Sequence, residues 1–147
     1  MASSDDRIFT SRERRRGYLD ALQAAGIEPD AGLICGDQYS AKCGYEVARR
    51  FLGQENRPTA IFGANDAIAA GAYQAAVEMG LRIPEDVAIA GYGNERESEA
   101  LMMTSVDQQP DQMARMAIER LFERMEEPAA QADVRVVPVN VIVRRTS

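Results

Sequence analysis

The stretch that most constrains the fold is residues 57–94, RPTAIFGANDAIAAGAYQAAVEMGLRIPEDVAIAGYGN. It contains an apolar run at 59–62, flanked by Pro58 and Gly63, and a second run at 87–90 that ends at Gly91. Between the two runs, apolar and small residues recur with helical spacing after a capping position at Asn65 or Asp66. Two short strands joined by a helix are most simply parallel neighbours, so the stretch predicts a βαβ unit.

The same unit predicts where a binding site would lie. Asn65 and Asp66 directly follow the first predicted strand, and Tyr92, Gly93 and Asn94 directly follow the second. Because ligands of open parallel sheets bind at the carboxyl ends of the strands, we expect these residues to share one rim.

The remaining pattern also alternates between helices and strands. A capping box at 10–13 predicts a helix that ends near Gly26, and Ser40 is placed to cap a second helix that ends at Gly53. Pro110 is placed as the first residue of a further helix. Short strands are expected at 32–35, 104–107, 134–136 and 139–143.

Composition predicts one globular unit that does not bind nucleic acid by charge alone. Of 147 residues, 46% are hydrophobic and 27% are charged, and the net charge of −6 opposes binding to a polyanion. Four arginines gather at positions 12, 14, 15 and 16, but on a helix they point in several directions. We interpret them as mostly solvated side chains rather than a DNA-binding patch.

Catalytic and metal-binding motifs are absent from the sequence. The chain has no histidine, no nucleophile elbow and no phosphate-binding loop, and Cys35 and Cys43 lack metal-site spacing. Both cysteines are expected to be small buried side chains. No apolar run reaches the length of a membrane span, and residues 1–6 have no signal-like character. The sequence therefore predicts a cytoplasmic protein that is not an enzyme and uses no metal or cofactor.

The wording of the central stretch resembles one family. PTAIFxANDxxAxGA followed by GLRIPEDVxIxGY is similar to the effector-binding core of LacI/GalR bacterial transcriptional regulators, and the likeness continues in RxxGY, GDQYS, MTSVDQ and VIVRR. It implies an α/β, periplasmic-binding-protein-like (type I) core with a mostly parallel sheet.

The resemblance also implies a domain organisation. Residues 1–107 would form an incomplete C-terminal subdomain that lacks its first strand, 108–138 would return to the N-terminal subdomain, and 139–147 would cross back. The DNA-binding headpiece of the family would be absent, so operator DNA would be bound only through that missing part.

The resemblance transfers a set of candidate effector contacts, with no catalytic or metal-binding residue among them. Arg14 matches an arginine that binds ligand hydroxyls or carboxylates, and Tyr39 matches an aromatic position that stacks on a sugar ring. Asn65 would offer a donor and an acceptor, against the plainer interpretation of a helix cap. The full set of expected ligand residues is Arg14, Tyr39, Asn65, Asn94, Gln108 and Met113.

One departure from the family changes the expected ligand. Gly93 stands where the family commonly has an aspartate after Gly-Tyr, and this loss of a carboxylate beside a retained Arg14 favours an anionic ligand such as a sugar acid over a neutral sugar. Glu95 could restore the carboxylate.

The resemblance finally implies a homodimer and leaves alternatives open. A transport-type solute-binding protein shares the core fold, and a module that only dimerises is a third possibility. Plausible exposed apolar positions for a dimer interface are Tyr73, Val77, Leu101, Met102 and Met103.

Overall fold

A computed structural model describes residues 8–35, 38–129 and 131–147 of the chain. One four-stranded sheet has the order β1-β2-β3-β4. The first three strands are parallel neighbours and the last is antiparallel to the third. The expected α/β fold with a mostly parallel sheet is therefore confirmed. The strands are β1 (Ala60–Phe62), β2 (Ala88–Gly93), β3 (Thr104–Asp107) and β4 (Asn140–Ile142).

Helices connect these strands much as the sequence predicts. The Ser40 hydroxyl accepts a hydrogen bond from the Cys43 amide, and Asn65 Oδ1 accepts one from the Ile68 amide, so both predicted caps are confirmed. Pro110 opens the last helix, where its missing amide hydrogen costs nothing. The helices are α1 (Phe9–Ala24), the 3₁₀ turn η1 (Ala31–Leu33), α2 (Ala41–Leu52), α3 (Asp66–Glu78), α4 (Arg96–Ala100) and α5 (Pro110–Glu126).

Three local predictions are wrong. Helix α1 starts from Ile8 without a side-chain cap, and the Ser11 hydroxyl is buried against the Tyr39 hydroxyl instead. The expected strand at 32–35 is a 3₁₀ turn closed by the Asp30 carboxylate, with only a single bridge at Cys35. Residues 134–136 are extended but pair with no strand among the described residues, because only α5 lies beside them.

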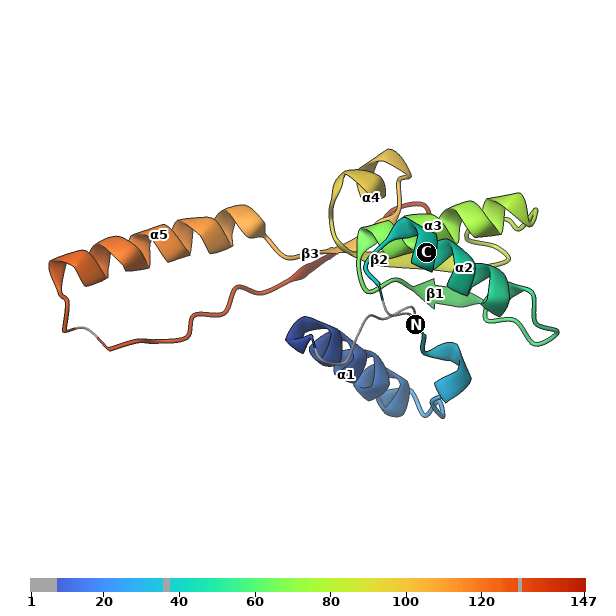
Figure 1. Cartoon of the computed structure of the whole chain (residues 1–147), viewed down its shortest axis with the longest axis horizontal. Coiled ribbons are helices and arrows are strands. Elements are labelled where there is room, and N and C mark those ends of the chain that lie inside the picture. Colours follow the sequence, from blue (N-terminus) through green and yellow to red (C-terminus); the bar gives the residue numbers. More distant parts are fainter. Residues whose placement is uncertain (1–7, 36–37, 130) are drawn as a thin grey trace.

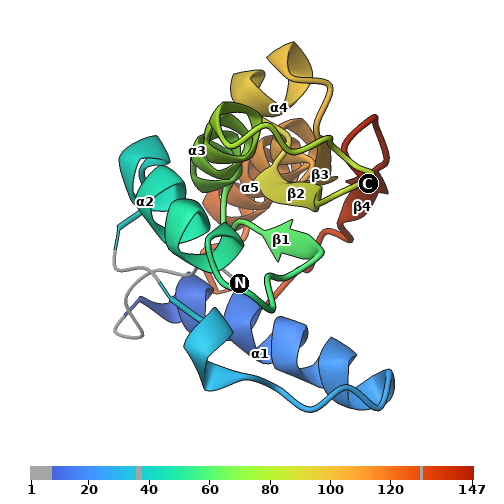
Figure 2. The same ribbon diagram turned by 90° about the vertical axis from the view of Figure 1, so that its right-hand side faces the viewer.

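Helices α2 and α3 lie together on one side of the strands (Figure 2). A side chain at Gly44 would overlap the Ile68 carbonyl oxygen, and one at Gly71 would overlap the Ala41 carbonyl oxygen. The two helices can therefore touch backbone to backbone only because both positions are glycine. Cys43 is buried in this contact as expected, whereas Cys35 is only half-buried.

The main core lies between this helix pair and the sheet. It contains mostly small and β-branched side chains, as expected for a helix closely packed on a parallel sheet. Its buried members are Ala48, Leu52, Ile61, Ala69, Ala72, Ala75, Ala76, Val87, Ile89 and Met103.

The C-terminal residues complete this sheet. Thr146 is buried, and its hydroxyl donates to the Ile89 carbonyl while it accepts a hydrogen bond from the Thr104 amide. The Ile89 amide in turn donates to the Thr146 carbonyl. Thr146 therefore fills the place beside the start of β2 that β3 does not reach.

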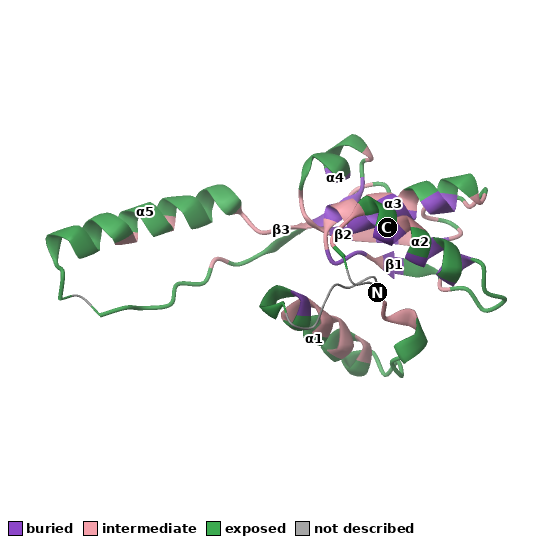
Figure 3. Cartoon of the chain, in the orientation of Figure 1, coloured by how far each residue is buried: buried purple, intermediate pink, exposed green. Residues whose placement is uncertain are grey.

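Helix α5 and the segment that follows it project away from the rest of the molecule (Figure 1). No residue of α5 is buried, and exposure continues along the returning segment to β4 (Figure 3). Several large apolar side chains on this arm are half or more exposed: Met113, Ile118, Leu121, Phe122, Met125, Val134, Val136 and Val139.

Candidate functional site

Arg14 joins three parts of the chain at the rim of the sheet. Its Nη1 donates a hydrogen bond of 2.8 Å to the carbonyl oxygen of Ala64, directly after β1. Its guanidinium carbon lies 4.0 Å from the ring centre of Tyr92 in β2 and 6.0 Å from that of Tyr39. A guanidinium stacked on an aromatic ring is held in place while most of its five N–H groups stay available.

Asn65 directly follows Ala64, whose carbonyl oxygen accepts the Arg14 hydrogen bond, and it has a structural role. Its side-chain oxygen caps α3 through the Ile68 amide at 2.9 Å. Its NH₂ group has no hydrogen-bond partner among the described residues, so it stays available as a donor. Both the helix-cap interpretation and the ligand-contact interpretation are therefore compatible with its geometry.

The buried carboxylate of Asp66 fixes the loop that follows β2. Its Oδ2 accepts a hydrogen bond of 2.6 Å from the Glu95 amide, and its Oδ1 accepts one of 2.6 Å from the Ser105 hydroxyl. The Ser105 oxygen accepts a hydrogen bond of 3.0 Å from the Asn94 amide. Gly93 and Asn94 have φ values of 132° and 55°. The loop therefore has one defined shape, maintained from α3 and β3.

The space at Gly93 is taken by the side chain of Glu95. A side chain built on Gly93 would begin 3.2 Å from Cγ and 3.2 Å from Oε1 of Glu95. The Glu95 carboxyl group thus lies beside the position from which a residue-93 side chain would extend.

Asn94 also lines a cavity of about 750 Å³ between the ends of β2 and β3 and the start of α5. Three carboxylates and one arginine are among its lining side chains. Its other lining residues are Gly93, Asp107, Gln109, Pro110, Asp111, Gln112, Arg115, Met116 and Glu119.

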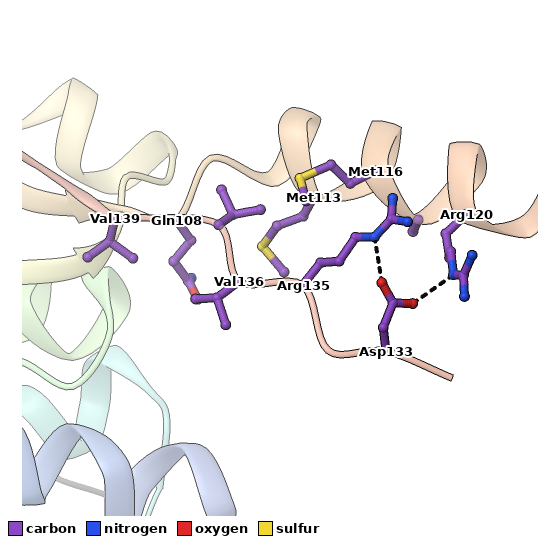
Figure 4. Close-up of a pocket in the computed structure, with 10 residues that line it drawn as sticks. Gln108, Met113, Met116, Arg120, Asp133, Arg135, Val136 and Val139 are labelled. Atoms are coloured by element: carbon purple, nitrogen blue, oxygen red, sulfur yellow. Dashed lines mark hydrogen bonds and ion pairs between the residues drawn. The ribbon is translucent and has the colours of Figure 1, made fainter. Parts of the chain in front are cut away.

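Gln108 and Met113 lie elsewhere, in a cavity of about 450 Å³ between α5 and the returning segment (Figure 4). Asp133 and Arg120 close its far end. The Arg120 Nε atom lies 2.7 Å from Asp133 Oδ1, and because this N–H is not aligned as a hydrogen bond the contact is an ion pair. The valines around it make this a mainly apolar space.

Hydrogen bonds from arginines lower the pKa of two acidic side chains, one in α5 and one in the segment after it. The pKa of Asp133 is lowered chiefly by a hydrogen bond from Arg135, and the pKa of Glu123 is lowered by hydrogen bonds from Arg120 and then Arg135. These pairs link α5 to the segment after it.

The six expected ligand residues therefore do not form one cluster. Arg14, Tyr39 and Asn65 lie together, Asn94 lines the polar cavity, and Gln108 with Met113 lines the apolar one. Sequence reasoning left Tyr92 out of the ligand set and placed it after the strand, whereas β2 continues through Tyr92 to Gly93. It gave no sign of Ser105 or Arg144, which contact the rim from distant parts of the chain.

The expected interface residues differ in exposure. Met103 is completely buried, so the expectation that it is exposed is wrong. Met102 has a φ of 48° and is 45% exposed, and this left-handed residue turns the chain so that its neighbour points into the core. Val77 is exposed, whereas Tyr73 and Leu101 pack partly against the core.

Two further kinds of site are absent from the described residues. No group of three or more acidic, cysteine or histidine side chains could hold a metal ion there. Within the same part of the chain, no helix combines the length and apolar character needed to cross a bilayer.

This fold, with its polar rim at the strand ends, is that of a ligand-binding α/β domain. The periplasmic binding protein-like domain family matches residues 2–147, and the chain belongs to this family. The predicted likeness to LacI/GalR regulators is also confirmed, because the curated relatives are transcriptional repressors and the structural neighbours include the lac repressor.

The relatives cover nearly the whole chain. It is 36% identical over 140 residues to the HTH-type transcriptional repressor PurR of Edwardsiella ictaluri, which covers 93% of this chain and 41% of the repressor. It is 35% identical over 126 residues to PurR of Escherichia coli O1:K1 / APEC, covering 81% and 37%. The chain thus spans about two fifths of the length of the curated relatives it matches.

Solved structures agree with this assignment. The complex of the transcriptional regulator CelR with cellobiose matches with a TM-score of 0.89 and 28% identity, covering 99% of this chain and 45% of that one. The lac repressor dimer bound to operator and the anti-inducer ONPF matches with a TM-score of 0.87 and 26% identity, covering 99% and 51%.

Proposed function

We propose that the chain forms the effector-binding part of a LacI/GalR-type transcriptional regulator, and that a small metabolite binds at the rim described above. The observation that carries the proposal is the placement of Arg14 between Ala64 and Tyr92. This contact presents a cation with several unused donors at the carboxyl ends of β1 and β2, where open parallel sheets bind their ligands.

The chemistry of the rim supports a hydroxylated or acidic metabolite. Arg14 can donate only, so it selects hydroxyl oxygens, carbonyls or carboxylates. The rings of Tyr39 and Tyr92 lie beside Arg14, so the rim combines aromatic surface with a cation. Gly93 brings no carboxylate of its own, and a sugar acid therefore remains the favoured class. Glu95 would favour a neutral sugar if its carboxylate turned into the site.

The proposal also includes a domain organisation. Residues 1–107 would belong to the C-terminal subdomain, the exposed arm at 108–138 to the N-terminal one, and 139–147 to the crossing back. An effector that contacts both subdomains favours one relative orientation, and only its differential affinity for the two states can alter DNA binding. DNA contact itself would come from a headpiece outside this chain, in a cytoplasmic homodimer.

A ligand screen tests the proposal. Thermal shift and calorimetry would compare D-galactose, D-galacturonate and D-gluconate on the wild type, Arg14→Ala and the control Arg16→Ala, which changes an exposed arginine of the same helix. We expect at least one compound to bind, and Arg14→Ala to weaken it about tenfold or more while Arg16→Ala does not. Equal binding by all three proteins would refute the role of Arg14.

The rival class, a transport-type solute-binding protein, shares the core fold. The matched relatives are named as repressors, and this favours the regulator. The genomic sequence upstream of Met1 separates the two classes. An in-frame helix-turn-helix supports the regulator, and a signal peptide supports the solute-binding protein.

A further inference from the structure

We propose that Arg144 is a positioning residue that turns the side-chain amide of Asn94 into a pure hydrogen-bond donor at the rim, so that the site selects a neutral acceptor atom of the ligand there. The proposal rests on the proposed function, because it assigns a chemical preference to the same effector site.

The guanidinium of Arg144 is held from two sides. Its Nη1 donates a hydrogen bond of 2.8 Å to the Met103 carbonyl oxygen, and its Nη2 donates one of 2.7 Å to Asn94 Oδ1. The Arg144 backbone amide also donates to the Thr104 hydroxyl at 2.9 Å. Arg144 lies just after β4 in the chain, so the C-terminal segment is hydrogen-bonded to the loop that follows β2.

The hydrogen bond from Arg144 fixes the orientation of the Asn94 side-chain amide. An arginine side chain carries only donors, so the carboxamide must turn its oxygen toward Arg144 and its NH₂ group away. The Asn94 backbone amide is already bound to Ser105. Among the described residues the Asn94 NH₂ group has no partner, and the residue lines the 750 Å³ cavity. The unused group of the Asn94 side chain is therefore a donor.

The charges around the cavity indicate which kind of ligand atom can lie next to Asn94. Asp107, Asp111 and Glu119 line the same cavity with the cation Arg115, and the Arg144 guanidinium at Asn94 Oδ1 adds a second cation, so the carboxylates still outnumber the cations there. A carboxylate next to Asn94 would meet net negative charge, whereas a hydroxyl, carbonyl or ring oxygen would not. The Asn94 donor thus complements a neutral acceptor atom of the ligand.

A measurement without ligand tests the hydrogen bond between Arg144 and Asn94. In ¹H–¹⁵N spectra of the full chain, the Asn94 side-chain amide should give two dispersed proton signals. Arg144→Met should shift them to free-amide positions, and Arg144→Lys, which restores a donor, should recover them in part. Arg145→Met, a change of the exposed neighbouring arginine, should leave them in place. Unchanged Asn94 signals in folded Arg144→Met would overturn the proposal.

A binding measurement tests the donor without disturbing Arg144. Asn94→Asp keeps an oxygen for Arg144 but removes the NH₂ group, so it is expected to fold normally and to bind D-galacturonate about tenfold more weakly. Binding as tight as in the wild type would overturn the donor role even if Arg144→Met did not fold. If no wild-type binding of D-galacturonate, D-galactose or D-gluconate is seen, the proposed ligand class fails, and the spectra alone decide the orientation of Asn94.

Discussion

Replacing Gly71 by alanine should destabilise the protein, although alanine is the better helix former. Gly71 lies inside α3, where its Cβ would overlap the Ala41 carbonyl oxygen and lie 2.7 Å from the Tyr45 nitrogen. These are backbone atoms of α2, so no side chain can turn away, and the two helices must separate. Overpacking of this kind costs about 1–3 kcal/mol or more.

The opposing effect is smaller. Alanine gains roughly 0.5–1 kcal/mol over glycine in a helix interior. The net loss should be about 1–2 kcal/mol, which lowers the melting temperature by roughly 2–8 °C in a chain of this size. Gly17→Ala is the matched control, since nothing lies within 4 Å of a Cβ at that position in α1. It should raise the melting temperature by roughly 1–4 °C.

Calorimetric melting of both variants measures the two effects separately. The helix pair also sets the distance between the starts of α2 and α3, which carry Tyr39 and Asn65. Gly71→Ala should therefore weaken metabolite binding as well. A Gly71→Ala protein that melts at or above the wild-type temperature would refute the close-contact argument.

Four further outcomes are expected. Asn65→Asp keeps the capping oxygen of α3 but loses the NH₂ donor, so it should melt near the wild type and bind the metabolite about tenfold more weakly; equal affinity would leave Asn65 as a cap only. The chain alone, with a net charge of −6, should not retard duplex DNA specifically at physiological salt, and nanomolar retardation would contradict this. Sedimentation at micromolar concentration should show a dimer that Met102→Asp weakens, rather than a single 16.1 kDa species. Arginine hydrogen bonds lower the pKa of Asp133 and of Glu123. The stability that these two ionised carboxylates contribute is therefore complete above the ordinary carboxylate pKa of about 4 and is lost as pH falls through the lowered pKa values. Chemical shifts of residues 131–135, followed during acidification, should report the release of this segment from α5.

Local patterns predicted the fold well because the chain follows them closely. The caps at Ser40 and Asn65 and the proline at the start of α5 lie where the sequence places them. The prediction of a strand at 134–136 was wrong because a strand needs a neighbouring strand to pair with. Alternation of apolar and polar residues cannot show whether such a neighbour exists. The exposure expected at Met103 failed because one left-handed residue reversed the direction of the next side chain.

The site was only partly predictable. The rim followed from strand order, and Arg14 was selected through the family resemblance. Arg144 could not be found from its neighbours in the sequence, because its contacts with Met103 and Asn94 span 41 and 50 positions. Such contacts exist only after the sheet has formed.

Thr146 has a consequence for the order in which this domain can be made. It supplies both a donor and an acceptor to Ile89, 57 positions earlier in the chain. Until residue 146 has been synthesised, the start of the central strand β2 keeps an open edge and the Thr104 amide lacks its partner. Contacts of this sequence separation form slowly because a long loop must close first. A ribosome that stalls shortly before this codon would therefore hold a nascent chain in which the start of β2 and the Thr104 amide lack these hydrogen-bond partners.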